Sequence, residues 1–330
     1  MSLPRPVSVF CASLIVYFSA GSSQALVIYG GNGLGNTNDP SGGLPWGNAG
    51  SVGGASGVYL GNFETGSWVL SATHVTGGGA PGITLAGVFY AGVVGSGVQI
   101  RNGDNTTTDL ALFRIASAPI LPNLTLATSR PSSGEVATLI GNGGVEGTFK
   151  RWDVTTVAGT QNDVWTETAS VSASDYVGYT VVGGIGKRWG QTLYFGSGYT
   201  FNVNGTGPTA NVITSFDAIS GSSLAVGGDS GSALFYSISG QFVLGGITSS
   251  LLSLGTPDTA PPGGAVATGK TFGTYYNLNG YADIVNYRDA ILATVGSATP
   301  IPEPAAAAGV VGALVLLTGF AVRRRRITCR

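Results

Sequence analysis

Residues 227–234 read Gly-Gly-Asp-Ser-Gly-Ser-Ala-Leu, a serine flanked by glycines immediately before an apolar run. Two residues that suit the chemistry of such a serine precede it in the chain: His74 in Ser-Ala-Thr-His-Val and Asp109 in Thr-Thr-Asp-Leu-Ala-Leu. A serine hydroxyl is a weak nucleophile that needs a base within hydrogen-bond distance. A carboxylate can in turn hold that base in the right tautomer. The order His74, Asp109, Ser230 therefore predicts a nucleophilic catalytic triad.

The segments around these residues favour an all-β fold. Apolar stretches of four to eight residues alternate with Gly, Asn and Ser, and Gly accounts for 55 of the 330 residues. Such short, turn-bounded runs are typical of β-sandwiches and barrels. One segment near the end, 281–295, has apolar residues on one helical face, and 256–269 is rich in proline and predicts a loop. The expected strands are 67–75, 109–115, 135–143 and 241–248.

The three motifs, taken in this order, resemble those of the chymotrypsin/trypsin family of serine proteases, and the resemblance spans about residues 28–296. It implies a chymotrypsin-like double six-stranded β-barrel with a short C-terminal helix, His74 and Asp109 in the first barrel and Ser230 in the second. The implied roles are nucleophile for Ser230, general base for His74 and orienting carboxylate for Asp109. The amides of Gly228 and Ser230 would form the oxyanion hole, and no cofactor is needed.

Two of the departures from the family pattern concern the N-terminus and the specificity pocket. The family's mature N-terminus reads Ile-Val-Gly-Gly and inserts beside the aspartate before the serine, which is Asp229 here. In this chain 28–31 reads Ile-Tyr-Gly-Gly, so we expect Asp229 to have a different partner. The specificity pocket, assigned to Leu224, Ser249 and Leu251, has no acid, which predicts an uncharged P1 side chain.

Charge and composition exclude several classes of protein. Between residues 26 and 300 there are nine basic and fifteen acidic residues, a net charge of −6, which is the wrong sign for nucleic-acid binding. The two cysteines, Cys11 and Cys329, lie near the ends, so neither a disulfide framework nor a thiolate metal site is expected between them. With His74 as the single histidine, a multi-histidine zinc site is excluded.

Both ends of the chain carry targeting patterns. Residues 1–25 have an early arginine, an apolar run and a small-x-small end, which predicts a signal peptide cleaved after Ala25. Residues 297–330 contain Pro-Glu-Pro, an apolar stretch at 305–322 long enough to span a bilayer, and an arginine-rich end at 323–330. This order resembles the PEP-CTERM sorting signal, which implies processing by an exosortase-type enzyme. The alternative is a permanent transmembrane anchor.

The sequence therefore predicts a signal peptide (1–25), a trypsin-like protease domain (26–296) and a sorting segment (297–330). The expected protein is an exported serine endopeptidase, at least transiently anchored by residues 305–322 in the cell envelope, that acts on protein or peptide substrates. A catalytically inactive envelope or matrix protein on the same scaffold is the alternative. An α/β-hydrolase is excluded because no histidine follows Ser230. The order Asp39, His74, Ser230 would also suit a subtilisin-like protease. However, the sequence lacks the amphipathic helices that cover the sheet of an α/β fold.

Overall fold

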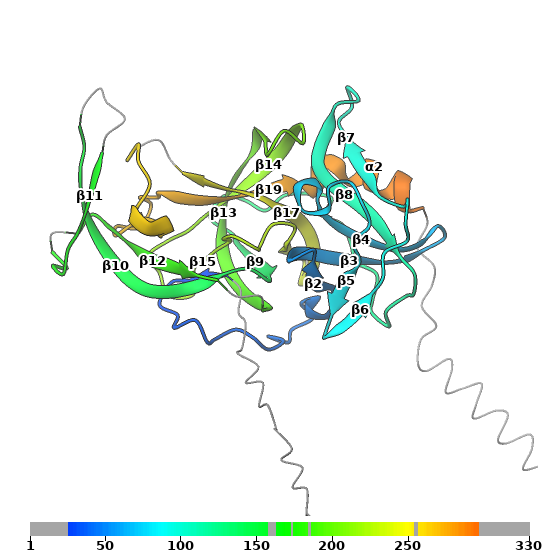
Figure 1. The fold of residues 1–330 in the computed structure, drawn as a ribbon, viewed down its shortest axis with the longest axis horizontal. Coiled ribbons are helices and arrows are strands. Elements are labelled where there is room, and N and C mark those ends of the chain that lie inside the picture. The colour runs from blue at the N-terminus through cyan, green and yellow to red at the C-terminus, as the bar shows by residue number, and fades with distance from the viewer. Residues whose placement is uncertain (1–25, 158–162, 173, 184–185, 254–256, 297–330) are drawn as a thin grey trace, which may run out of the picture.

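The structure is a computed structural model that describes residues 26–157, 163–172, 174–183, 186–253 and 257–296. It is mostly β, with two main sheet regions and a C-terminal helix, and this part of the predicted fold is confirmed (Figure 1). The predicted signal peptide and the sorting segment lie outside the described residues. Among the residues that are described, no helix is both long and apolar enough to cross a membrane.

The first region is a seven-stranded antiparallel sheet in the order β6-β5-β2-β3-β4-β8-β7. Its central strands β3, β4 and β8 are buried on both faces, because their alternate residues pack in two separate core clusters. The strands are β2 Ala49–Val52, β3 Ala55–Phe63, β4 Gly66–Ala72, β5 Ile83–Leu85, β6 Val88–Tyr90, β7 Val98–Arg101 and β8 Thr107–Ile115. The short 3-10 helix η1 Trp46–Asn48 precedes them.

The second region is a closed six-stranded barrel in the order β13-β14-β19-β17-β16-β9. All its neighbouring strands are antiparallel. The strands are β9 Val136–Gly141, β13 Arg188–Asn202, β14 Pro208–Ser215, β16 Ala233–Ile238, β17 Gln241–Ser253 and β19 Asn277–Asp283. The six-stranded barrel that the resemblance implied is therefore present once, since the first region is a sheet of seven strands.

A third sheet, which the sequence did not predict, lies beyond the barrel at the end away from the first sheet (Figure 1). Its order is β11-β10-β12-β18, with β10 Val145–Thr155, β11 Val164–Glu167, β12 Tyr176–Val182 and β18 Val266–Gly269. Four aromatic rings pack edge to face or tilted in a small core of their own: Trp152, Trp165, Tyr176 and Tyr276. The strand β18 and the 3-10 helix η2 Pro262–Gly264 occupy much of the predicted loop 256–269.

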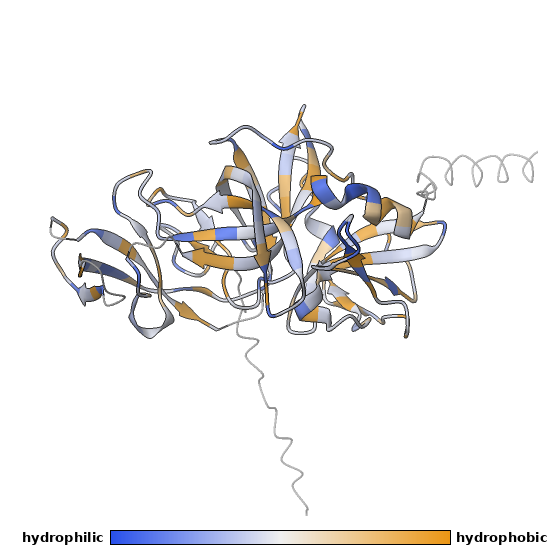
Figure 2. Cartoon of the chain, turned by 90° about the horizontal axis from the view of Figure 1, so that it is seen from above, coloured by the Kyte–Doolittle hydropathy of each residue, from blue (hydrophilic) through white to orange (hydrophobic). Residues whose placement is uncertain are grey.

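The C-terminal helix α2 spans Ile284–Val295 and packs its buried face against the junction of the first sheet and the barrel. Figure 2 shows hydrophilic and hydrophobic residues along this helix, as its amphipathic pattern requires. The prediction was wrong at its start, because 281–283 belong to β19. Tyr281 pairs with strands on both sides, and the Asp283 side chain accepts a hydrogen bond from Val285 N and so caps the helix.

One hydrophobic core joins the two main regions. It contains Leu70 and Leu112 from the first sheet, Ile140 and Phe235 from the barrel, and Ile291 from α2. Because the two regions share this core, side chains from each are held in a fixed relation at their junction. The residues of the predicted triad lie along this junction.

Candidate active site

His74 lies just beyond the end of a buried strand. Strand β4 ends at Ala72, and the chain then makes the single helical turn α1, Thr73–Thr76, which ends at Gly77 in a left-handed conformation. The Thr73 hydroxyl donates a hydrogen bond to the Thr108 carbonyl at 3.1 Å and so holds this turn against β8. The imidazole of His74 remains partly accessible, with 14% of the side chain exposed.

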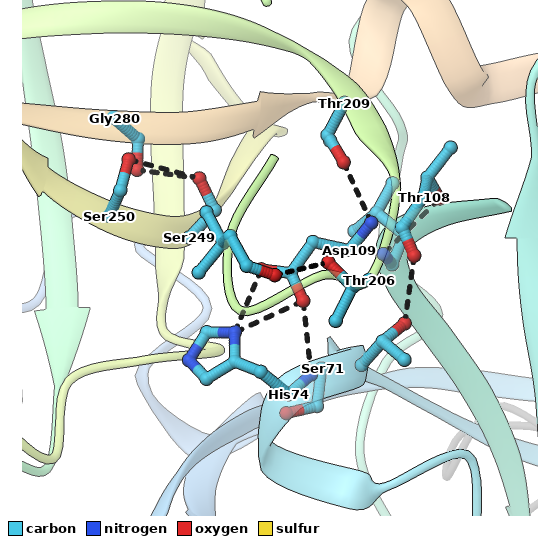
Figure 3. Close-up of polar contacts among 12 residues, drawn as sticks. Ser71, His74, Thr108, Asp109, Thr206, Thr209, Ser249, Ser250 and Gly280 are labelled. Carbon is cyan, nitrogen blue, oxygen red and sulfur yellow. Dashed lines mark hydrogen bonds and ion pairs between the residues drawn. The ribbon is translucent and has the colours of Figure 1, made fainter. Parts of the chain in front are cut away.

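His74 and Asp109 form a close pair (Figure 3). The imidazole Nδ1 lies 2.8 Å from Asp109 Oδ2 and 3.0 Å from Oδ1, and the backbone N–H of His74 also donates to Oδ1 at 3.0 Å. A carboxylate facing Nδ1 favours the tautomer that carries its proton there. The Nε2 lone pair is then free to act as a base on the opposite side of the ring.

Asp109 itself is fixed from the barrel side. Its carboxylate is fully buried, and its backbone N–H donates to the Thr209 hydroxyl on β14 at 2.7 Å, a contact drawn in Figure 3. Thr209 is fully buried too, and its hydroxyl donates to the Gly207 carbonyl at 3.2 Å. The sequence did not predict this contact of Thr209 with the Asp109 backbone, because a threonine in a strand carries no sequence signal for it.

Ser230 lies in the turn between β15 (Ser223–Leu224) and β16, and it is half-buried. The structure places this turn against the first sheet, since Ser56 N on β3 donates to the Ser230 carbonyl at 2.9 Å. Within the described chain, the Ser230 hydroxyl has no hydrogen bond, and none joins it to His74. The structure thus pairs His74 with Asp109 and brings the Ser230 backbone to the same sheet.

Gly231 allows this close approach. Its φ is +81°, and a Cβ at this position would overlap the Ser56 carbonyl oxygen and the Ser71 hydroxyl. Only glycine fits both the backbone conformation and the space. The glycine after Ser230 therefore allows the turn to lie directly against the first sheet. One of the atoms it approaches belongs to Ser71, which lies on β4 three residues before His74.

Along the turn 228–231, backbone N–H groups that donate a hydrogen bond alternate with N–H groups that do not. Asp229 N donates to the Val226 carbonyl and Gly231 N to the Thr248 carbonyl. The amides of Gly228 and Ser230 donate to no acceptor in the part of the chain that the structure describes, and Gly228 has a φ of +92°. Two free N–H groups at this spacing can bind an oxyanion.

Asp229 is the buried acid of this turn. It is fully buried, and burial raises the pKa of its carboxyl to about 7, although hydrogen bonds from backbone N–H groups oppose the rise. The oxygen Oδ1 accepts from Gly143 N at 2.8 Å and Oδ2 from Val226 N at 2.9 Å. Hydrogen bonds from the backbone N–H groups of Leu26 and Asn142 also lower the pKa of the carboxyl. Its partners are therefore backbone amides, one of them at the first residue after the predicted signal peptide.

The residues assigned to the specificity pocket differ in exposure. Leu224 is fully buried and packs in a core cluster with Val27, Phe216 and Val266, among others. Ser249 is 3% exposed, and its hydroxyl donates to Asn211 Oδ1 at 2.7 Å, whereas Leu251 is 44% exposed. Leu251 is thus the one side chain of the three with substantial access to solvent.

No metal site was found: within the described residues, no three His, Cys, Asp or Glu side chains gather closely enough to hold an ion.

No family model matches this chain, and no curated protein matches it. Solved structures of chymotrypsin-like serine proteases match at low sequence identity. The Rv3671c protease of M. tuberculosis, in its inactive form, is 11% identical with a TM-score of 0.41, and the match covers 79% of this chain and 95% of that one. Kallikrein-related peptidase 10, in complex with Zn2+, is 14% identical with a TM-score of 0.41 and coverage of 78% and 98%. Mouse neuropsin is 16% identical with a TM-score of 0.42 and coverage of 80% and 99%. At identities and TM-scores this low, the matches say nothing about activity.

Proposed function

We propose that the protein is a serine endopeptidase that uses Ser230, His74 and Asp109. The observation that carries the proposal is the pair of contacts from His74 Nδ1 to both oxygens of the buried Asp109 carboxylate. This geometry leaves Nε2 as the acceptor, on an imidazole that is still accessible. A histidine held in this way is prepared for general base catalysis.

The reaction proceeds in two halves through an ester. Ser230 Oγ attacks the carbonyl carbon of the scissile peptide bond, and its proton moves to His74 Nε2. The negative charge that forms on the carbonyl oxygen is bound by the free amides of Gly228 and Ser230, and one such donor typically contributes about 2.7–4 kcal/mol to the transition state. The C–N bond then breaks, and Nε2 returns the proton to the leaving amine. Water attacks the acyl-enzyme by the same route and releases the acid.

Asp109 stabilises the imidazolium during both halves. The carboxylate is buried and lies within hydrogen-bond distance of the ring Nδ1 through both oxygens, so the ring cannot turn away without losing both contacts. Such prearrangement lowers the reorganisation needed when charge develops.

Labelling with a fluorophosphonate tests the proposal, because the reagent reacts only with an activated serine. We expect the wild-type chain to be labelled and Ser230→Ala not to be. The matched control is Ser220→Ala, which removes an exposed hydroxyl from the preceding loop and should leave labelling unchanged. A wild-type chain that is folded but neither labelled nor able to cut a peptide library would favour the alternative, an inactive envelope or matrix protein.

We further propose that the chain is exported, that the signal peptide is cut after Ala25, and that residues 305–322 anchor it until an exosortase-type enzyme cuts the tail. The support is the sequence order of leader, Pro-Glu-Pro, apolar stretch and arginines. The intact mass of the protein recovered from its own host tests this. A mature form that starts at Leu26 and ends near residue 300 is expected, whereas a form that retains Arg330 would indicate a permanent anchor.

A further inference from the structure

A small cavity lies at the surface of the barrel, separate from the residues proposed for catalysis. Its volume is about 190 Å³, and it is lined by Val136 at the start of β9, by residues 191–193 of β13 and by residues of the segment 217–222. Pockets for drug-sized ligands measure about 300–1,000 Å³, so this cavity admits only a smaller group. None of its lining residues belongs to the predicted triad, oxyanion hole or specificity pocket. Binding there is therefore independent of the proposed peptidase function.

Asp217 is the buried acid of this cavity. It is 1% exposed, yet within the described chain its Oδ1 has no hydrogen-bond partner. The other oxygen, Oδ2, accepts from the Ser215 hydroxyl at 2.7 Å. Burial raises the pKa of the Asp217 carboxyl, and the hydrogen bond from Ser215 opposes the rise. A buried carboxylate normally has its charge paired and its oxygens hydrogen-bonded, so Oδ1 lacks a donor that a ligand could supply.

Hydrogen bonds hold the segment that carries Asp217 in place. The Asp217 N–H donates to the Ser222 hydroxyl at 2.9 Å, and the Ser222 N–H donates to the Ile219 carbonyl at 3.0 Å. The N-terminal segment binds the same turn, since Tyr29 N donates to the Ser222 carbonyl at 2.8 Å and Gly221 N to the Tyr29 carbonyl at 2.9 Å. The cavity is therefore preformed, and a ligand can bind without the cost of ordering this segment.

The walls of the cavity suit an organic cation better than a metal ion. Val136 and Ile219 are half-exposed, at 49% and 48%, and Leu193 adds a third apolar side chain. A divalent metal ion such as Ca²⁺ takes six or more oxygen ligands, whereas no three acidic, His or Cys side chains gather anywhere in the described ranges. A cation that carries a hydrocarbon chain would remove the apolar side chains from water.

The single available oxygen of Asp217 favours an ammonium over a guanidinium. A guanidinium binds a carboxylate best through two parallel hydrogen bonds, but Oδ2 already accepts from Ser215. An ammonium is a compact charge with three donors and needs only one carboxylate oxygen. The Gln191 side chain also lines the cavity, and its carboxamide oxygen can accept a second hydrogen bond.

We propose that this cavity binds a primary ammonium group on a short apolar chain, with the ammonium donating to Asp217 Oδ1 and the chain lying between Val136 and Ile219. The net charge of −6 between residues 26 and 300 attracts such cations. The same chemistry occurs in the lysine side chain of a protein and in a free alkyl diamine.

The test measures the binding of n-butylammonium to the purified full-length chain by isothermal titration calorimetry, with n-butanol as the uncharged counterpart. We expect n-butylammonium to bind saturably and n-butanol not to bind at the same concentrations. From methylammonium to n-butylammonium, the affinity should rise by up to about fourfold for each CH₂ group that is buried. Asp217→Asn keeps the shape of the side chain but removes its charge, and it should weaken the binding of n-butylammonium by about tenfold or more.

Asp289→Asn is the matched control. It changes the net charge by the same amount, but Asp289 is 97% exposed on α2 and does not line the cavity. We expect its affinity for n-butylammonium to equal that of the wild type. Ile219→Ser removes an apolar wall and leaves Asp217 in place, so it should flatten the dependence of affinity on chain length while methylammonium still binds.

Two further ligands separate the sources of the ammonium group. Nα-acetyl-lysine methylamide presents a lysine side chain as a protein would, and cadaverine is a free diamine. Tighter binding of the lysine compound would indicate that a lysine-bearing protein docks here, whereas tighter binding of cadaverine would indicate a site for a small molecule. Both results support the proposed ammonium site.

Three results would overturn the proposal. These are n-butylammonium that binds no better than n-butanol, an affinity that Asp217→Asn and Asp289→Asn change equally, and sodium ions that compete as effectively as n-butylammonium. If Asp217→Asn fails to fold, the comparison with n-butanol and the Ile219→Ser series decide. Because the readout is binding, a chain without peptidase activity would refute the proposed function and leave this test intact.

Discussion

Asp229 gives the sharpest prediction, because its carboxyl is buried and its contacts are backbone amides. Burial raises its pKa from 3.8 to about 7. The folded chain therefore keeps a proton on this carboxyl between about pH 4 and pH 7, where the unfolded chain has lost it. Stability rises with pH only where the unfolded state binds more protons, and here the folded state binds more. The free energy of unfolding should thus fall across this window.

The size of the fall follows from the two pKa values. One pKa unit corresponds to about 1.4 kcal/mol, so the shift from 3.8 to about 7 corresponds to about 4 kcal/mol at most. Other groups titrate in the same range, and Asp229→Asn is therefore the reference. The free energy of unfolding of both chains is measured in urea from pH 4 to pH 8, with residue 25 still attached to Leu26. It should fall more steeply with pH for the wild type than for Asp229→Asn.

The N-terminus provides a second arm of the same experiment. Leu26 N is one of the groups that act on the Asp229 carboxyl. In a chain that begins at Leu26 this nitrogen is an ammonium, and an opposite charge at a buried carboxylate lowers its pKa. In that chain, the fall in the free energy of unfolding between pH 4 and pH 7 should become smaller or vanish. Equal pH slopes for the wild type and Asp229→Asn, in chains that retain residue 25, would refute the reasoning.

Three further predictions concern the site and its support. His74→Ala should lose as much kcat as Ser230→Ala, because triad members act as a unit, and pre-steady-state assays on both variants check this. Gly231→Ala should lower both activity and melting temperature, since a Cβ there has no space and φ is positive; an active, fully stable variant would contradict the geometry. Glu146→Ala should cost about 3–5 kcal/mol of unfolding free energy in urea, because it leaves the fully buried guanidinium of Arg188 unpaired.

The sequence predicted those features that depend on local patterns. The expected strands 67–75 and 109–115 correspond to β4 and β8, and the pairing of these two strands brings Ala72 opposite Leu110. That register places His74, two residues past the strand end, next to Asp109. The motif spacing and the strand pattern thus contained enough information for this half of the site.

The edge strand β18 of the third sheet depends on contacts between distant parts of the chain, and no local pattern predicts them. Strand β12 pairs with β18, so that Tyr176 lies opposite Gly269 and Tyr179 opposite Val266. The partners are about ninety residues apart, and the short β18 falls within a stretch whose prolines predicted a loop. The contact between Thr209 and Asp109 was missed for a similar reason, because it joins two distant segments of the chain.

The N-terminal segment connects the predicted export signal to the active-site turn. Leu26 is fully buried, and its carbonyl accepts from Arg188 Nη1 at 2.8 Å. Two residues on, Ile28 N donates to Glu146 Oε2 at 3.0 Å, and the same Glu146 carboxylate binds Arg188. A peptidase could not reach the bond before Leu26 once these contacts have formed, because the backbone on its C-terminal side is enclosed. If the signal peptide ends at Ala25, its removal therefore precedes the docking of this segment, and the new terminus enters the structure beside Asp229 as the domain folds.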